Sequence, residues 1–128
     1  MPKILYVESH MALCDILAQS LHLASNYEVA VAHNGLEGVE KAHTWQPDLI
    51  LTGLRLPLMD GYEAIKRLRS DPDTANIPII VLSAWDSAQH RERALAAGAN
   101  EHLGNPVELK RLLQSINRHL KKLRPSSS

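Results

Sequence analysis

The sequence has one cysteine, no phenylalanine and no net charge, and each of these features limits the bonds, the core or the partners that the chain can have. A single cysteine, Cys14, excludes a disulfide within the chain. The 14 lysine and arginine residues balance the 14 aspartate and glutamate residues, so no overall field draws the chain to nucleic acid or membrane. With 45% apolar residues but no phenylalanine, the core of this 128-residue chain must be mainly aliphatic.

Long apolar runs are missing too. No stretch is long enough to span a membrane, and residues 1–10 carry one lysine before a strand-like segment, unlike a signal peptide. We therefore expect a cytoplasmic protein. The turn after the first strand, residues 7–12, contains no glycine, which excludes a Walker-type or dinucleotide phosphate loop. Cys14 lies among apolar residues, where we expect a buried thiol.

Apolar, β-branched runs alternate with segments of helical period along the chain. The predicted strands are residues 3–7, 27–32, 48–52, 77–83 and 99–103, and the predicted helices are residues 11–24, 36–45, 61–71, 87–98 and 106–123. This alternation predicts an α/β fold with a five-stranded parallel sheet and five crossover helices. Such a sheet forms a doubly wound sandwich, and the flavodoxin-like strand order 2-1-3-4-5 is one of its two common forms.

We expect one domain, residues 1–124, followed by a polar tail or linker stump, residues 125–128. The last helix carries an apolar stripe to the end of the chain. Its members are Leu109, Leu112, Leu113, Ile116, Leu120 and Leu123. Most of the stripe must be core, and its later leucines are a candidate dimer surface. The accompanying lysines and arginines are read as a solvated face and not as a nucleic-acid site.

In a doubly wound sheet, ligands gather beyond the carboxyl ends of the strands. Four groups of residues stand there: Glu8, Ser9 and His10; Gly53 and Arg55; Ser83 to Trp85; and Gly104 to Pro106. These positions are the candidate site.

Four segments resemble, in order and spacing, the receiver domains of bacterial two-component response regulators. They are "PKILYVESH", "QPDLILTGLRLPLMDGYEAIKRLR", "IPIIVLSAW" and "ALAAGANEHLGNPVELKRLL", and together they cover essentially the whole chain. The resemblance implies the 2-1-3-4-5 order and a role in phosphorelay signalling rather than an enzyme activity.

The family transfers a phosphoryl group to an aspartate, with Mg²⁺ held by carboxylates and the phosphoryl oxygens received by a lysine and a hydroxyl. By the resemblance, the aspartate falls on Gly53, the lysine on Asn105, the acidic pair on Glu8 and Ser9, and the hydroxyl on Ser83. Only Ser83 keeps its expected chemistry, and Mg²⁺ binding should be weak or absent. The chain is therefore interpreted as a pseudo-receiver with a degenerate phosphorylation pocket and no cofactor.

Two neighbours carry no weight as substitutes: the Thr52 hydroxyl should face away from the pocket, and Asp60 is a turn residue. Arg55 is a candidate replacement for the metal, paired with Glu8 and supported by Asn105 and Ser83. The alternative is that Arg55 points into solvent, where such a pair contributes roughly 0–1 kcal/mol.

The resemblance also places a switch aromatic at His102, which is either a pH-sensitive rotor or a partly exposed, hydrogen-bonded histidine. It implies a cis peptide at Asn105-Pro106. The seven histidines show no metal-binding spacing, so no metal site is predicted.

The expected function is a phosphorylation-independent signalling module that binds a histidine kinase, another regulator or an output domain of its own chain. A homodimer through the fourth helix, fifth strand and fifth helix is a further candidate, and "LPLMDG" is a candidate contact loop. Two alternatives remain. One is phosphorylation on Ser9, Ser83 or His10; the other is an anion or small-ligand sensor built from Arg55, Asn105, Ser83 and Trp85.

Overall fold

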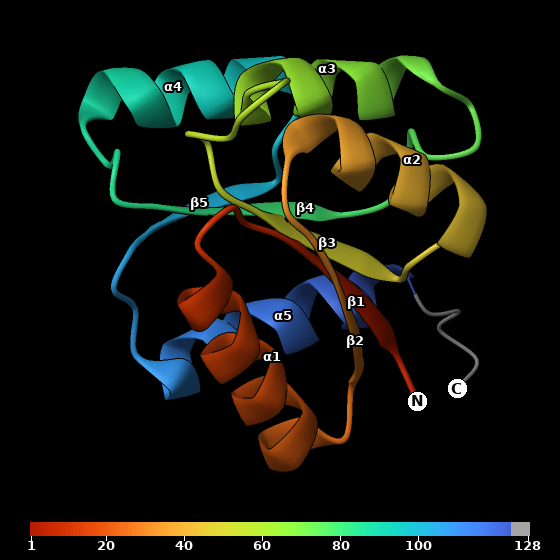
Figure 1. Cartoon of the computed structure of the whole chain (residues 1–128), viewed down its shortest axis with the longest axis vertical. Coiled ribbons are helices and arrows are strands. Elements are labelled where there is room, and N and C mark those ends of the chain that lie inside the picture. The colour runs from red at the N-terminus through yellow and green to blue at the C-terminus, as the bar shows by residue number, and fades with distance from the viewer. Residues whose placement is uncertain (124–128) are drawn as a thin grey trace.

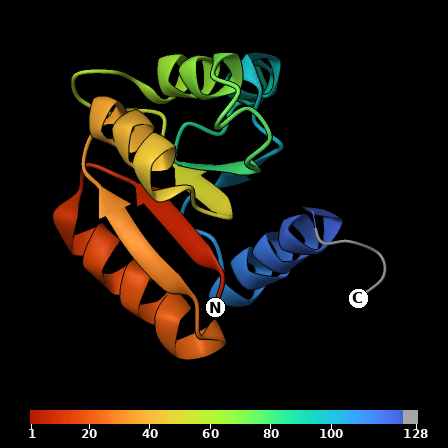
Figure 2. The same cartoon turned by 90° about the vertical axis from the view of Figure 1, so that its right-hand side faces the viewer.

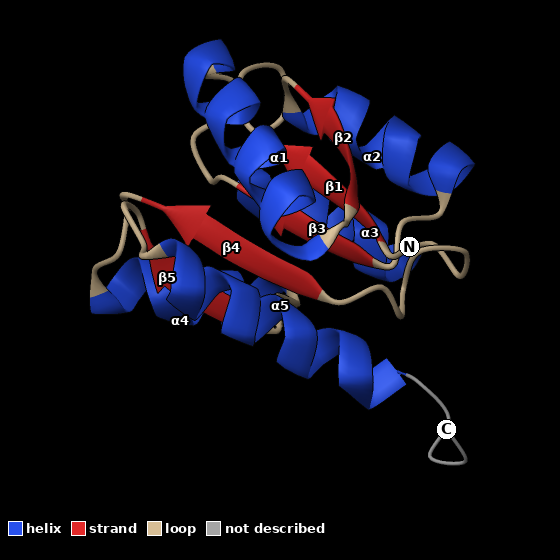
Figure 3. Cartoon of the chain, turned by 90° about the horizontal axis from the view of Figure 1, so that it is seen from below, coloured by secondary structure: helices blue, strands red, loops and turns tan. Residues whose placement is uncertain are grey.

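The computed structural model describes residues 1–123, in which five parallel strands alternate with five helices. The strands are β1 (Lys3–Val7), β2 (Glu28–Ala32), β3 (Leu49–Thr52), β4 (Ile79–Ser83) and β5 (Glu101–Gly104). The helices are α1 (Met11–Ser25), α2 (Gly35–Trp45), α3 (Gly61–Ser70), α4 (Ala88–Ala97) and α5 (Leu109–Leu123). The sheet order is β2-β1-β3-β4-β5, visible in Figure 3, which confirms the predicted flavodoxin-like topology.

The sheet is covered on both faces, as the continuous apolar strands predict. Helices α1 and α5 lie on one face and α2, α3 and α4 on the other (Figures 1 and 2). Successive strand residues point to opposite faces, so β1 sends Ile4 and Tyr6 into the core under α1 and α5. It sends Leu5 and Val7 into the core under the other three helices.

Two predictions, one of a boundary and one of burial, need correction. The last helix begins at Leu109 and not at residue 106, since the chain bends at Asn105 and Pro106 before the helix starts. The Asn105-Pro106 peptide is cis. The cis peptide itself was predicted and is confirmed. Leu120 is buried, so it is not available for a dimer surface. The tail at residues 124–128 and the side chain of Leu123 lie outside the described residues.

One half-buried guanidinium holds the loops at the amino end of β4 and β5. Arg69, at the end of α3, donates to the carbonyls of Gly98, Ala75 and Ile77 and to the side-chain oxygen of Asn100, at 2.7–2.9 Å. The same Asn100 oxygen accepts the N–H of Ile79, at the start of β4. Burial lowers the pKa of Arg69. The loops before β4 and β5 are therefore held by side-chain hydrogen bonds far from the carboxyl ends of the strands.

Among residues 1–123, no helix is long and apolar enough to cross a membrane.

Candidate functional site

The carboxyl ends of four strands meet around one cavity of about 320 Å³, here called the strand-end pocket. It is lined by Glu8, Ser9, His10, Leu13, Gly53, Leu54, Arg55, Leu82, Ser83, Ala84, Trp85 and Asn105. All six residues predicted for the degenerate pocket therefore lie together. The apolar lining from Leu13, Leu54 and Leu82 is not part of the sequence prediction.

Gly53 follows β3, and its N–H donates to the carbonyl of Val7 at 2.9 Å. Its backbone is not in the left-handed region, so the conformation does not require glycine. A Cβ built on Gly53 would lie 3.2 Å from Oε1 of Glu8, 3.7 Å from Leu56 and 3.8 Å from the Val7 carbonyl. Only the end of a flexible side chain would have to move to admit one.

Glu8 is the only carboxylate in the pocket lining. One of its oxygens, Oε1, lies beside the space above Gly53, and the other, Oε2, accepts the N–H of His10 at 3.1 Å. The thiol of Cys14 donates to the Glu8 carbonyl at 3.1 Å. Burial, and next the negative charge of Glu8, raise the pKa of Cys14 to about 11. Cys14 is therefore a buried, unreactive thiol, as predicted.

A short chain of hydrogen bonds joins the pocket hydroxyl to His102 on β5. The Oγ of Ser83 accepts the N–H of Trp85 at 3.1 Å, and the carbonyl of Trp85 accepts from Nε2 of His102 at 2.9 Å. His102 is 5% exposed, so the expectation of a partly exposed histidine is wrong, although its hydrogen bond is present. Its Nδ1 is buried without a partner in the described structure. Both backbone polar groups of Trp85, in the loop after β4, are thus hydrogen-bonded to side chains.

The ring of Trp85 continues this loop into an aromatic stack that sequence reasoning missed. It stacks on His90 of α4 with ring centroids 5.0 Å apart, and Nδ1 of His90 bonds the hydroxyl of Tyr62 on α3 at 2.7 Å. Arg93 lies 3.9 Å from the centre of the Tyr62 ring. Because these residues come from different elements, no local spacing in the sequence announces them.

Arg55 is exposed, and no ion pair joins it to Glu8 within residues 1–123. The proposed substitution of a metal by this arginine is therefore wrong, and the solvent-facing alternative holds. The two neighbours that were set aside behave as expected. Thr52 is buried and donates to the Gly53 carbonyl, and Asp60 caps α3 by accepting the N–H of Glu63 at 2.9 Å.

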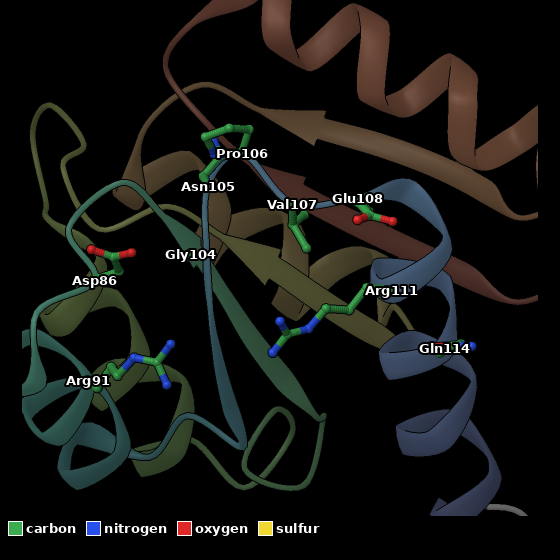
Figure 4. A pocket seen from close by; sticks show the side chains of 9 residues that line it. All are labelled: Asp86, Arg91, Gly104, Asn105, Pro106, Val107, Glu108, Arg111 and Gln114. Carbon is green, nitrogen blue, oxygen red and sulfur yellow. The ribbon is translucent and has the colours of Figure 1, made fainter.

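Asn105 lies at the junction of the strand-end pocket with a second cavity. This second cavity, the α4–α5 groove, has a volume of about 580 Å³ and runs over β5. Arg91 of α4 and Arg111 of α5 extend into it from opposite sides, with Asp86 and Glu108 on its rim (Figure 4). The groove therefore offers charges of both signs between two helices.

Helix α1 carries exposed apolar side chains, a second feature that the sequence analysis missed. Met11, Leu13, Ile16 and Leu23 are between 43% and 75% exposed. The available signal is the composition of residues 11–24, which holds more large apolar side chains than one buried stripe needs.

Comparison with known proteins matches this chain to one family. The family model described as "Response regulator receiver domain" matches residues 4–117. The DNA-binding dual master transcriptional regulator RpaA of Synechocystis is 34% identical over 95% of this chain and 50% of its own length. The response regulator MprA of Mycobacterium avium is 34% identical over 96% of this chain and 53% of its own. The chain thus spans about half the length of these relatives.

Solved structures show the same fold. The receiver domain of a Francisella response regulator superposes with a TM-score of 0.89 at 25% identity, covering 97% of this chain and 100% of its own. The receiver domain of a Pseudomonas aeruginosa sensor histidine kinase, with magnesium coordinated in its active-site cleft, gives a TM-score of 0.82 at 30% identity. That match covers 94% of this chain and 98% of the Pseudomonas chain.

Proposed function

The chain belongs to the response regulator receiver domain family, and on that premise we propose that it is a receiver module that signals without being phosphorylated. A receiver domain of a two-component system is a signalling module and not an enzyme. The proposal concerns how this one signals: through protein contacts made by one stable conformation of its pocket loops.

The main support for this proposal is that a glycine, Gly53, occupies the phosphoacceptor position. It stands at the end of β3 in the wall of the strand-end pocket, where the family resemblance places the aspartate that accepts the phosphoryl group. Glycine has no side chain and cannot form an acyl phosphate. Since the Gly53 backbone would accept another residue, the absence of a carboxylate is not a requirement of the fold.

The donor set in the pocket does not fit Mg²⁺. This ion demands near-octahedral oxygen coordination and gives up its water reluctantly, so protein sites rely on carboxylate charge. Glu8 is the single carboxylate of the lining, and its Oε2 is already hydrogen-bonded to the His10 backbone. Ser9 and Asn105 supply neutral groups where the family has a carboxylate and a lysine. The pocket thus has one carboxylate to hold a metal, and it lacks the lysine that would receive a phosphoryl group.

The loop after β4 is already held without a phosphoryl group. Trp85 bonds Ser83 on one side and His102 on the other, and its ring packs on His90. In the family, the hydroxyl and the aromatic on the fifth strand move together on phosphorylation. Here the observed bonds join the same two positions through the backbone of Trp85. This arrangement supports a loop with one resting conformation that presents a fixed surface.

We place the contact surfaces on the outer side of α4, β5 and α5 and on the loop containing Leu58. The α4–α5 groove provides charges of both signs, and the Leu58 side chain is 81% exposed. Candidate partners are a histidine kinase, another regulator, a second copy of the chain or an output domain of the same protein. We place the module in the cytoplasm, with no membrane or nucleic-acid contact of its own.

A small-ligand sensor is the second candidate, because the strand-end pocket is a real cavity of about 320 Å³ with Ser83, Trp85, Asn105 and Arg55 on its walls. Phosphorylation of Ser9, Ser83 or His10 is disfavoured, because the pocket lacks the carboxylates that would hold a metal beside the transferred group.

The test is an amide NMR spectrum of the labelled 128-residue chain before and after addition of Mg²⁺ with beryllofluoride, a phosphoryl mimic. We expect the peaks of Glu8, Gly53, Ser83 and Asn105 to stay still. The matched control is the triple variant Ser9→Asp, Gly53→Asp, Asn105→Lys, which restores the family's donor set and should respond. Shifts of the unmodified chain at millimolar Mg²⁺ would show that the pocket still senses the ligand, and the proposal would fail.

A further inference from the structure

A histidine and two aspartates meet at the end of the molecule opposite the strand-end pocket. His43 lies in the last turn of α2, Asp71 directly follows α3, and Asp73 lies in the turn after it. Helices α2 and α3 lie next to each other on one face of the sheet, and their carboxyl ends point the same way (Figure 1). The folded chain therefore joins side chains that are 28 residues apart in the sequence.

The ligand atoms of this cluster are spaced as they would be around one small cation. Nδ1 of His43 is 3.1 Å from Oδ2 of Asp71 and 3.7 Å from Oδ2 of Asp73, and all three atoms lie within 4.8 Å of one another. Ligands bound at roughly 2.0–2.1 Å to a tetrahedral Zn²⁺ lie about 3.3–3.4 Å apart. The distances of 3.1 and 3.7 Å bracket that value, so the spacing of His43 from each aspartate is compatible with one bound ion.

The backbone beneath the cluster is held in place. Oδ1 of Asp71 accepts the N–H of Asp73 at 2.9 Å, which leaves its Oδ2 directed toward His43. The Asp71 carbonyl accepts the N–H groups of Thr74 and Ala75, and the buried Thr74 hydroxyl donates to the Leu68 carbonyl. Hydrogen bonds of this kind orient metal ligands and reduce the ordering needed on binding.

We propose that His43, Asp71 and Asp73 form a Zn²⁺ site with a fourth position open to water. One imidazole with two carboxylates is a nitrogen and oxygen donor set that suits Zn²⁺, whereas Mg²⁺ and Ca²⁺ prefer oxygen ligands alone. The three side chains are between 38% and 65% exposed, so an ion can enter without opening the fold. Bound metal would connect the end of α2 to the loop between α3 and β4.

The competing account is an ion pair in which a protonated His43 lies between two carboxylates. The two accounts differ in their response to metal. A Zn²⁺ site requires a neutral imidazole, so zinc affinity falls as the pH is lowered. An ion pair alone binds no zinc at any pH.

The test is a calorimetric titration of the untagged 128-residue chain with zinc chloride, followed by the amide NMR spectrum. We expect one Zn²⁺ per chain, with shifts at His43, Asp71 and Asp73 and none at Gly53. The variants His43→Gln and Asp73→Asn should bind zinc at least about tenfold more weakly. The control His33→Gln removes another exposed histidine, next to α2, and should bind as the unmodified chain does.

Three results would overturn the inference: no zinc binding at neutral pH, binding that His43→Gln leaves unchanged, or equal shifts on adding Mg²⁺. These results do not depend on the strand-end pocket, so the zinc site and the phosphorylation-independent function stand or fall separately.

Discussion

Gly53 and Gly61 stand eight positions apart in the sequence, one directly after β3 and the other at the start of α3, yet the structure needs only one of them to be glycine. A Cβ on Gly61 would lie 2.3 Å from the carbonyl oxygen of Gly53 and 2.7 Å from the Cα of Leu54. Both of those atoms are backbone and cannot move aside. At Gly53 the nearest atom is the end of the flexible Glu8 side chain, at 3.2 Å. The fold therefore requires glycine at position 61, where a side chain would overlap backbone atoms, but not at position 53.

We expect Gly61→Ala to lower the free energy of unfolding by about 2–3 kcal/mol, because the added methyl group overlaps backbone atoms and forces the loop apart. Gly53→Ala should change it by less than about 1 kcal/mol, because the strain at Glu8 is small and alanine restricts the unfolded chain. Urea denaturation of the two variants measures both effects. A large loss at Gly53 would mean that its backbone requires glycine after all.

At the scale of residues, the sequence predicted which functional groups the pocket contains better than it predicted how exposed each side chain is. The sequence alone shows that Gly53 carries no carboxylate and that Asn105 is neutral, once the strands are aligned with those of the family. The exposure of Arg55 and the burial of His102 are not, because each depends on packing between elements that are distant in sequence. The partnership of His43 with Asp71 is hidden for the same reason.

At the scale of elements, β5 and α5 are joined by one carboxylate. Oε1 of Glu101 accepts from Ser115 at 2.5 Å, from Arg118 at 2.6 Å and from Nε2 of His119 at 2.9 Å. Burial alone would raise the pKa of Glu101, but the hydrogen bonds from Ser115, His119 and Arg118 outweigh it and hold the pKa below its usual value. The folded state thus favours the ionised carboxylate.

A lowered pKa makes this contribution to stability dependent on pH in one direction. It is complete above the ordinary glutamate pKa of 4.5 and is lost as the pH falls through the lower folded value. We expect Glu101→Gln to cost about 1–2 kcal/mol at neutral pH, since a neutral amide is a weaker acceptor for these groups. The difference between the variant and the unmodified chain should shrink as the pH falls below 4.5.

Chemical denaturation across this pH range measures both free energies of unfolding. The matched control is Glu63→Gln, which alters an exposed pair with Arg67 on α3 and should give a small difference at every pH. A difference at Glu101 that grows in acid would contradict the assigned direction of the pKa shift.

Elements were predicted well where pattern alone determines them. The strand at residues 3–7 matches β1, because a short β-branched run between polar residues has few alternatives. The predicted strand order 2-1-3-4-5 places β2 at an edge of the sheet, and this position is confirmed. The start of α5 was placed too early, because helical periodicity continues through Val107 and Glu108, whereas the chain bends at Asn105 and Pro106 and becomes helical only at Leu109.

At the scale of the whole molecule, the α4–α5 groove is the candidate surface for self-association. A twofold axis across the groove would bring Arg91 or Arg111 of one copy toward Asp86 or Glu108 of the other. We expect self-association that rises with concentration and falls with added salt, because it would rest on exposed charges.

The double variant Arg91→Glu, Arg111→Glu should remain monomeric, whereas Lys66→Glu, which changes an exposed cation on α3 outside the groove, should associate normally. Sedimentation velocity over a range of concentrations measures the association. If the unmodified chain is monomeric throughout, the homodimer is wrong and the groove is left to a different partner.

The Arg69 hydrogen bonds and the strand-end pocket lie at opposite edges of the sheet. The guanidinium secures the loops before β4 and β5 at the amino end of the sheet, while the pocket residues stand at the carboxyl end. Substitutions at Ser9, Gly53 or Asn105 therefore remove none of the hydrogen bonds made by Arg69. A chain built this way tolerates variation at one edge of its sheet independently of the loops that are held at the other edge.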